Sequence, residues 1–139
     1  MSAVELTNKA LDFIQSNQPD FICLNYANPD MVGHTGVYEA ITKAVETVDA
    51  QLKRMSEVLV QHGYEMLVIA DHGNADFALN PDGSPNTAHS TNPVPVWYIT
   101  SDTNAKIESG KLADVAPSIL SILGVPQPKE MTGQNLIHD

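Results

Sequence analysis

Apolar residues recur at helical spacing in two segments of the chain. The longer pattern covers residues 37–59, where an apolar side chain returns every three or four positions. This spacing predicts one amphipathic helix of about 25 residues. The helix should end at His62 and Gly63, because glycine readily adopts the left-handed conformation that closes many helices. The imidazole of His62 is expected to cap this end. A shorter amphipathic helix is predicted over residues 5–16.

Short apolar runs bounded by turn residues predict three strands. These runs are residues 21–26, 65–70 and 95–100. The order strand, long helix, strand predicts a right-handed crossover and therefore a parallel sheet. Residues 27–36 and 71–93 are rich in glycine, proline and polar residues and are predicted to be loops.

A last helix is predicted over residues 112–124, provided that Pro117 lies in its first turn. The chain has 139 residues, 42% of them hydrophobic, so it is long enough to bury a core. No repeat, low-complexity tract or linker divides it. We therefore expect residues 1–139 to form one unit of α/β architecture, with a mostly parallel sheet flanked by helices.

The charge balance is strongly acidic. Seventeen acidic residues against seven basic ones give a formal net charge of −10, which argues against nucleic acid or an anionic membrane as a partner. Arg54 is the only arginine, so the guanidinium clamp typical of enzymes that bind phosphate monoesters is not found in this sequence.

Cys23 is the only cysteine and lies within an apolar run, so we expect a buried thiol and no internal disulfide. Residues 1–20 contain no basic segment followed by an apolar stretch, and no apolar run approaches the roughly 20 residues that span a bilayer. A cytoplasmic location is therefore expected.

Three histidines and two carboxylates stand in the segments that follow or flank the predicted strands: Asp30, His34, Asp71, His72 and His89. Ligands bind at the carboxyl ends of the strands in an open parallel sheet, so these five side chains are expected to converge at one edge. Imidazole and carboxylate together suit Mn2+ or Zn2+ better than an ion that prefers oxygen ligands alone. This combination leads to the hypothesis of metal-assisted phosphate chemistry.

Each of these residues has a simpler interpretation when it is taken alone. An aspartate after a strand is commonly a helix cap or a loop residue. A lone loop histidine such as His89 is more often exposed or hydrogen-bonded than bound to a metal. Their shared position at one edge of the sheet is what favours a metal site. No role is expected for His138, which lies in the tail.

The same residues belong to segments that resemble the cofactor-independent phosphoglycerate mutases, a family of the alkaline phosphatase superfamily. The similarity is carried by residues 25–36 (NYANPDMVGHTG), 70–76 (ADHGNAD) and 87–95 (TAHSTNPVP), with further matches at 112–117 and 130–137. The Asp-His-Gly element is shared with phosphatases, sulfatases and phosphopentomutases, whereas the first and third segments are more specific for the mutase. The resemblance implies an alkaline-phosphatase-like layered sandwich, of which this chain is the carboxyl-terminal portion and thus a partial domain.

By this resemblance the parent enzyme holds two Mn2+ ions, with Zn2+, Co2+ or Mg2+ as alternatives. Asp30, His34 and His89 match the ligands of the first ion, and Asp71 and His72 match part of the set of the second. The family interconverts 3-phosphoglycerate and 2-phosphoglycerate in glycolysis through a phosphoserine intermediate. The ions activate the serine and neutralise charge on the phosphoryl group. The parent is expected to be monomeric.

No counterpart of the family's serine nucleophile, amino-terminal aspartate or substrate-binding arginines is found in this sequence. Ser90 lacks the strand-to-helix setting of that nucleophile and is interpreted as a turn residue. We therefore expect a fragment that is inactive alone, with weak or empty metal sites. Two alternatives stay open: another enzyme of the superfamily, such as a phosphopentomutase or phosphodiesterase, and a non-catalytic metal-binding or interaction module.

Overall fold

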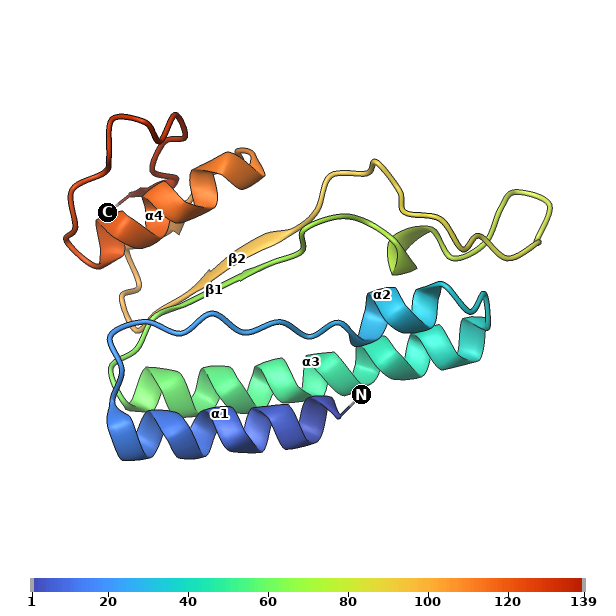
Figure 1. The fold of residues 1–139 in the computed structure, drawn as a ribbon, viewed down its shortest axis with the longest axis horizontal. Helices are drawn as coiled ribbons and strands as arrows, with labels where there is room; N and C mark the ends of the chain where they lie inside the picture. Colours follow the sequence, from blue (N-terminus) through green and yellow to red (C-terminus); the bar gives the residue numbers. More distant parts are fainter. Residues whose placement is uncertain (1, 139) are drawn as a thin grey trace.

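The structure is a computed structural model that describes residues 2–138. It shows a layer of helices, a β-ribbon beside that layer, and a small carboxyl-terminal part at one end (Figure 1). The elements in chain order are α1 (Ala3–Asn17), α2 (Asn28–Gly33), α3 (Tyr38–Gln61), β1 (Met66–Ile69), the 3-10 turn η1 (Ala75–Phe77), β2 (Val96–Ile99), β3 (Lys106–Ile107), the 3-10 turn η2 (Leu112–Asp114), α4 (Val115–Ile122) and β4 (Ile137–His138).

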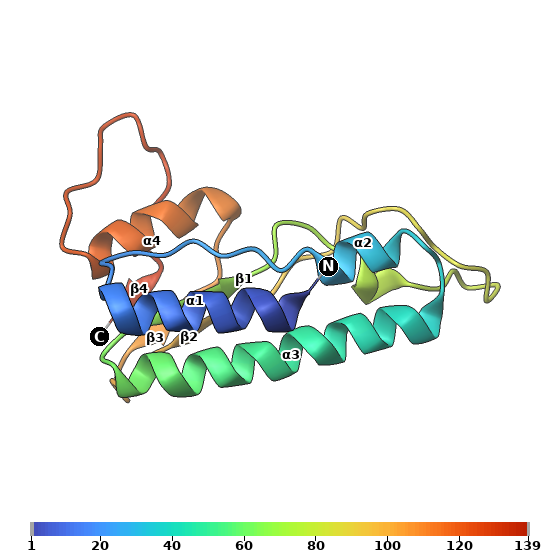
Figure 2. The same cartoon turned by 60° about the horizontal axis from the view of Figure 1, so that its bottom comes forward.

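Helices α1 and α3 lie side by side and form the helical layer (Figures 1 and 2). The facing sides of these two helices share a core of buried apolar side chains: Ala10, Leu11, Ile14, Met55 and Leu59. This packing explains the spacing in the sequence, because residues three or four positions apart lie on one face of a helix. The two helices predicted at these places are confirmed as α1 and α3.

Helix α3 ends where the sequence predicts. Gly63 adopts the left-handed conformation with a φ of 76°. Nδ1 of His62 donates a hydrogen bond of 2.9 Å to the carbonyl oxygen of Val58. The same carbonyl oxygen also accepts the backbone N–H of His62 at 3.2 Å. The imidazole is therefore a second donor to a carbonyl of the last helical turn, and the predicted capping role of His62 is confirmed.

The central strands form an antiparallel ribbon. β1 pairs with β2 along its whole length, with Met66 opposite Ile99. The strands predicted at 65–70 and 95–100 are therefore confirmed, and they pair in the antiparallel sense. The parallel arrangement was predicted for residues 21–26 and 65–70, which form no ladder with each other among the described residues, so the mostly parallel sheet is not confirmed. The long connection over residues 70–95 allows the chain to reverse its direction before it enters β2. Within the described residues the other ladder is the short antiparallel pair of β3 and β4, so the expected layered sandwich is not confirmed.

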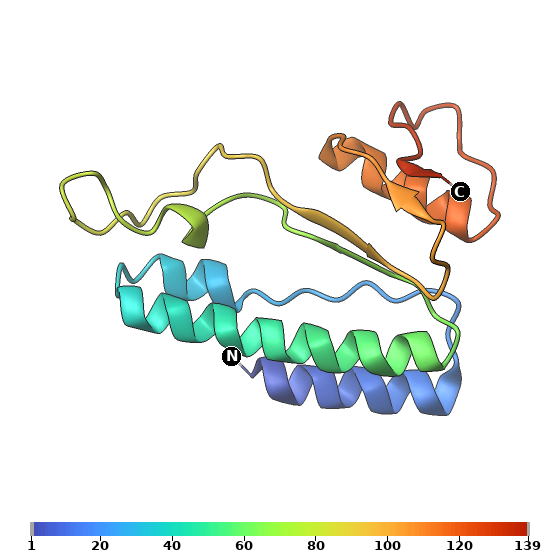
Figure 3. The same ribbon diagram turned by 180° about the vertical axis from the view of Figure 1, so that it is seen from behind.

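Residues 21–26, predicted as a buried strand, run extended along the helical layer and join no ladder among residues 2–138 (Figure 3). Ile22 and Leu24 pack against the core, whereas Phe21 is 53% exposed and Cys23 is exposed. This alternation is typical of a strand with one buried face. The prediction of a buried thiol is wrong, because Cys23 belongs to the outer face, which no second layer of the described chain covers.

A short helix interrupts the predicted loop 27–36. Helix α2 occupies residues 28–33, and Pro29 lies in its first turn, where the fixed φ of proline suits a helix and its missing N–H is not needed. Asp30 and His34 are four residues apart, so they lie on the same side of this helical turn. The local helix thus begins to assemble the candidate ligands.

The last predicted helix begins as η2 and continues as α4. Pro117 lies in the first turn of α4, as the prediction required. The buried carboxylate of Asp114 accepts hydrogen bonds from the backbone N–H groups of Lys111 at 2.8 Å and Gln134 at 2.9 Å. These bonds hold the tail against the start of α4.

None of the helices within residues 2–138 combines the length and the apolar character that crossing a membrane requires.

Candidate metal centre

Three side chains from two distant parts of the chain meet beside α2. Asp30 lies within α2 and His34 at its carboxyl end, whereas His89 belongs to the long segment between η1 and β2. Figures 1 and 3 show η1 and this segment passing close to α2. A bridge between Gly73 and Ser90 joins the two sides of the segment. Residues 55 positions apart in sequence are thereby brought together.

The three potential ligand atoms form a nearly equilateral triangle. Oδ1 of Asp30 lies 3.2 Å from Nε2 of His34 and 3.1 Å from Nε2 of His89, and the two nitrogen atoms are 3.2 Å apart. An ion with bonds of about 2.1 Å keeps neighbouring ligand atoms roughly 3.0 to 3.4 Å apart in octahedral or tetrahedral geometry. Both the spacing and the donor set therefore fit a divalent transition-metal ion. Among the described residues, this is the one group of three such side chains that converges to this degree.

A hydrogen bond from outside the triangle sets the orientation of the His34 ring. Its Nδ1 lies 2.8 Å from the carbonyl oxygen of Thr87. A carbonyl oxygen only accepts hydrogen bonds, so Nδ1 must carry the proton, and Nε2 of the neutral ring keeps its lone pair. Histidines that bind metals usually have an outer hydrogen bond of this kind.

Asp30 is held in its ionised form. Burial acts against the charge, but Nδ2 of Asn74 donates a hydrogen bond of 2.9 Å to Oδ1, and the nearby imidazoles of His34, His89 and His72 act in the same direction as Asn74. The net result is a pKa of Asp30 below its usual value. A carboxylate that is ionised at neutral pH is available as a ligand.

Asp71 and His72, which follow β1 directly, lie beside the triangle without completing a second one. Nε2 of His72 is 3.8 Å from Oδ1 of Asp71 and 4.0 Å from Oδ1 of Asp30. The ring of His72 stacks on that of His89 with the centroids 3.8 Å apart, whereas the Asp71 side chain is 86% exposed. All five predicted residues thus gather in one region, three of them at ligand spacing.

Sequence reasoning did not find the residues that support this cluster. Asn74 binds Asp30, and Asp76 accepts a hydrogen bond from Ser90. Gly33 leaves room for the Asn74 side chain, because a Cβ at this position would lie 2.7 Å from Cγ of Asn74. The available signal was proximity in sequence, since Asn74 and Asp76 share the ADHGNAD segment with two predicted ligands.

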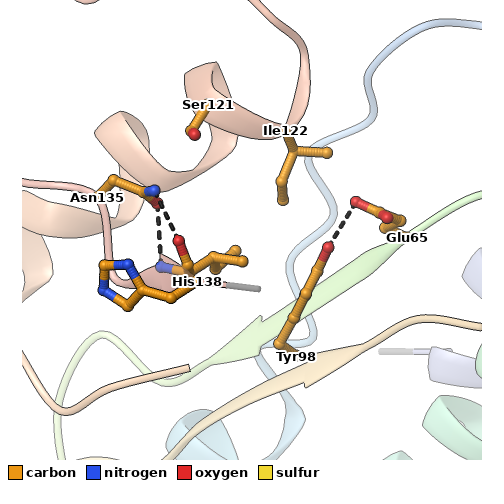
Figure 4. A pocket seen from close by; sticks show the side chains of 7 residues that line it. Glu65, Tyr98, Ser121, Ile122, Asn135 and His138 are labelled. Atoms are coloured by element: carbon orange, nitrogen blue, oxygen red, sulfur yellow. Dashed lines mark hydrogen bonds between the residues drawn. The ribbon is translucent and has the colours of Figure 1, made fainter. Parts of the chain in front are cut away.

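A separate polar hollow lies between the β-ribbon and the carboxyl-terminal part (Figure 4). The residues that line it include Glu65, Tyr98, Ser121, Ile122, Asn135 and His138. Tyr98 donates a hydrogen bond of 2.6 Å to Glu65. Burial, together with this bond and the charge of Glu65, raises the pKa of Tyr98 to about 12. None of the five predicted ligands lines this hollow, so it is distinct from the candidate metal centre.

The comparisons with known proteins agree with the geometry. The family profile of the metalloenzyme superfamily matches residues 1–127. The 2,3-bisphosphoglycerate-independent phosphoglycerate mutases of Parabacteroides distasonis and Bacteroides fragilis are each 61% identical over 137 residues, which cover 99% of this chain. The chain spans 27% of the length of these two relatives. The resemblance that the motifs indicated is therefore confirmed.

A solved structure extends this similarity to the backbone. It is described as Leishmania mexicana phosphoglycerate mutase at low cobalt concentration and matches with a TM-score of 0.88 and 28% identity. The match covers 99% of this chain and 28% of that chain. This agreement supports the predicted α/β class, although the ladders within residues 2–138 are small and antiparallel.

Proposed function

Because the chain belongs to the metalloenzyme superfamily, we propose that it is the metal-binding, carboxyl-terminal part of a phosphoglycerate mutase. The parent would interconvert 3-phosphoglycerate and 2-phosphoglycerate in cytoplasmic glycolysis. The observation that carries the proposal is the triangle formed by Asp30, His34 and His89. The 61% identity to two phosphoglycerate mutases supports this reaction over those of other superfamily enzymes.

In this proposal Asp30, His34 and His89 hold one divalent ion, and Asp71 and His72 contribute to a second. Mn2+ is the leading candidate, with Zn2+, Co2+ and Mg2+ as alternatives. When bound, such ions neutralise charge on phosphoryl oxygens and lower the pKa of an attacking hydroxyl group. The chain prepares the first site by itself, because the pKa of Asp30 is lowered and the hydrogen bond of Nδ1 of His34 with Thr87 leaves Nε2 facing Asp30.

The chain alone is proposed to be inactive. Phosphoryl transfer through a covalent intermediate needs a nucleophile next to the ions, and this sequence has no counterpart of the family's serine. Arg54 is its only arginine, and the guanidinium group binds Gln51 and Asn8 in the helical layer. The nucleophile and the substrate clamp would therefore come from the parts of the relatives that this chain does not cover.

A chimera tests the proposal. In it, this chain replaces the matching 27% of the Bacteroides fragilis mutase, to which it is 61% identical. We expect the chimera to interconvert the two phosphoglycerates in an enolase-coupled assay, whereas the isolated chain shows no turnover. Turnover by the isolated chain would contradict the assignment of the nucleophile to another part of the enzyme. A folded chimera that isomerises pentose phosphates instead would indicate a different superfamily reaction.

Substitutions in the chimera test the metal ligands. Asp30→Ala should abolish turnover while the far-ultraviolet circular dichroism stays unchanged. The side chain of Asp30 is 33% exposed, and the hydrogen bond that it would lose is the one from Asn74. Asp82→Ala is the matched control, since the side chain of Asp82 binds only Ser84 within the described residues. Equal activity of the two variants would remove Asp30 from the site.

A further inference from the structure

The segment that carries His89 has no regular secondary structure around this residue. Within residues 2–138, the side chain of His89 makes its polar contacts through Nε2, toward His34 and Asp30, and its ring stacks on that of His72. Nδ1 of His34 is fixed by a carbonyl group, but Nδ1 of His89 has no comparable partner among the described residues. All of these contacts join His89 to other candidate ligands, so the support of its ring from outside the cluster comes through the backbone of the neighbouring chain.

Asp76 anchors the chain that directly follows His89. One of its carboxylate oxygens, Oδ2, accepts a hydrogen bond of 2.9 Å from the hydroxyl group of Ser90 and one of 2.7 Å from Nδ2 of Asn92. The backbone N–H of Ser90 also donates a bond of 2.8 Å to the carbonyl oxygen of Gly73. Hydrogen bonds to a charged acceptor are about twice as strong as those between neutral groups, so Asp76 is the strongest link between η1 and this segment.

The link depends on the absence of a side chain at Gly73. A Cβ at this position would overlap the hydroxyl oxygen of Ser90 and would lie 2.7 Å from Oδ1 of Asp76. Glycine is therefore required for the backbone at position 73 to approach Ser90 and Asp76 this closely. The hydrogen bonds from Asn92 and Ser90 lower the pKa of Asp76, and the carboxylate stays charged at neutral pH.

We propose that Asp76 is a positioning residue that holds His89 at ligand distance from Asp30 and His34. This inference rests on the proposed metal site and extends it. The ADHGNAD segment then has two roles: Asp71 and His72 contribute ligands to the second ion, and Asp76 places a ligand of the first. A change at Asp76 should therefore alter the first site without removing any ligand from it.

The first experiment uses the metal-free 139-residue chain and nuclear Overhauser contacts between imidazole protons. The unchanged chain should show contacts of the His89 ring with the rings of His34 and His72, which lie 5.0 and 3.8 Å away between centroids. Asp76→Ala should lose these contacts and retain its helical circular dichroism. Asp82→Ala removes the same charge from the same long segment and should retain them, because Asp82 binds only within its own turn. Contacts that persist in Asp76→Ala would overturn the inference, and so would their absence from the unchanged chain.

The second experiment measures Mn2+ affinity by electron paramagnetic resonance. Loss of an outer-shell partner typically weakens metal binding about 10- to 100-fold, and we expect a loss of this size for Asp76→Ala. Asn92→Ala removes the 2.7 Å hydrogen bond to Asp76 and leaves the carboxylate of Asp76 in place. This variant therefore tests the positioning role if Asp76→Ala does not fold. The double variant should lose no more than Asp76→Ala alone, because Asn92 acts through Asp76. Fully additive losses, or unchanged affinity in both single variants, would overturn the inference.

The two experiments separate this inference from the proposed function. Ring contacts that depend on Asp76 in a chain that binds no Mn2+ would support the positioning role and count against the metal site. Mn2+ binding that depends on Asp30 but not on Asp76 would support the metal site and overturn the positioning role.

Discussion

Replacement of Gly33 by alanine should destabilise the candidate metal centre although none of the five candidate ligands is changed. Gly33 is buried and is the last residue of α2, and its φ is outside the left-handed region, so the backbone itself accepts alanine. A new Cβ would overlap Oδ1 of Asn74 and lie 2.7 Å from its Cγ. Asn74 is only 6% exposed and its Nδ2 binds Asp30 at 2.9 Å. The side chain cannot give way without losing this bond.

The magnitude follows from three contributions. Loss of a hydrogen bond to a charged group costs about 1.5 to 3 kcal/mol, and an extra methyl group in filled space costs about 1 to 3 kcal/mol. Alanine in place of glycine stabilises a helix by up to about 1 kcal/mol, which offsets part of this loss. The expected net effect is a decrease of roughly 1.5 to 6 kcal/mol in the free energy of unfolding.

Urea unfolding followed by circular dichroism measures this change, and a second background tests its cause. In Asn74→Ala the overlapping side chain is gone, so Gly33→Ala should there be neutral or stabilising by up to about 1 kcal/mol. If Gly33→Ala costs the same in both backgrounds, or leaves the original chain as stable as before, the contact between Gly33 and Asn74 does not have the role assigned to it.

Two further predictions concern pH. Hydrogen bonds from the backbone N–H groups of Gln134 and Lys111 lower the pKa of Asp114, so its contribution to stability is complete above the ordinary value of 3.8 and is lost as the pH falls below it. Asp114→Asn should therefore be less acid-sensitive than the original chain in urea unfolding, and parallel acid profiles would contradict this. The pKa of Tyr98 is raised from 10.0 to about 12, so the unfolded chain loses this proton first, and stability should fall as the pH rises from about 10 to about 12. Tyr98→Phe should not show this component of the loss, and a tyrosinate absorbance titration in which all tyrosines ionise near pH 10 would contradict it.

The helices followed from the sequence more closely than the strand partners did. The apolar repeat over residues 37–59 predicted α3 because that repeat records which side of one helix is buried. A short apolar run such as 21–26 records burial on a face but not the identity or direction of a neighbouring strand. The parallel pairing inferred for residues 21–26 and 65–70 therefore did not appear among the described residues, where 21–26 joins no ladder and β1 pairs with β2 in the antiparallel sense.

The candidate ligands were found in sequence because imidazole and carboxylate groups in loops are chemically distinctive. The expected reason for their convergence, one edge of a parallel sheet, does not apply within residues 2–138. Instead, α2 places Asp30 and His34 together, and the bridge from Gly73 to Ser90 brings His89 to them. Amide and carboxylate supports such as Asn74 and Asp76 follow no period, so only tertiary contacts reveal them.

The central claim is that Asp30, His34 and His89 form one site for a divalent ion. Its most direct test is a titration of the chain with Mn2+, followed by paramagnetic broadening of the imidazole proton signals, which detects weak as well as tight binding. We expect the signals of His34 and His89 to broaden first, with that of the stacked His72, while those of His62 and His138 stay sharp, and we expect Asp30→Ala to remove this selectivity. Equal broadening of all five histidines in the original chain, or no broadening of His34 and His89, would contradict the claim.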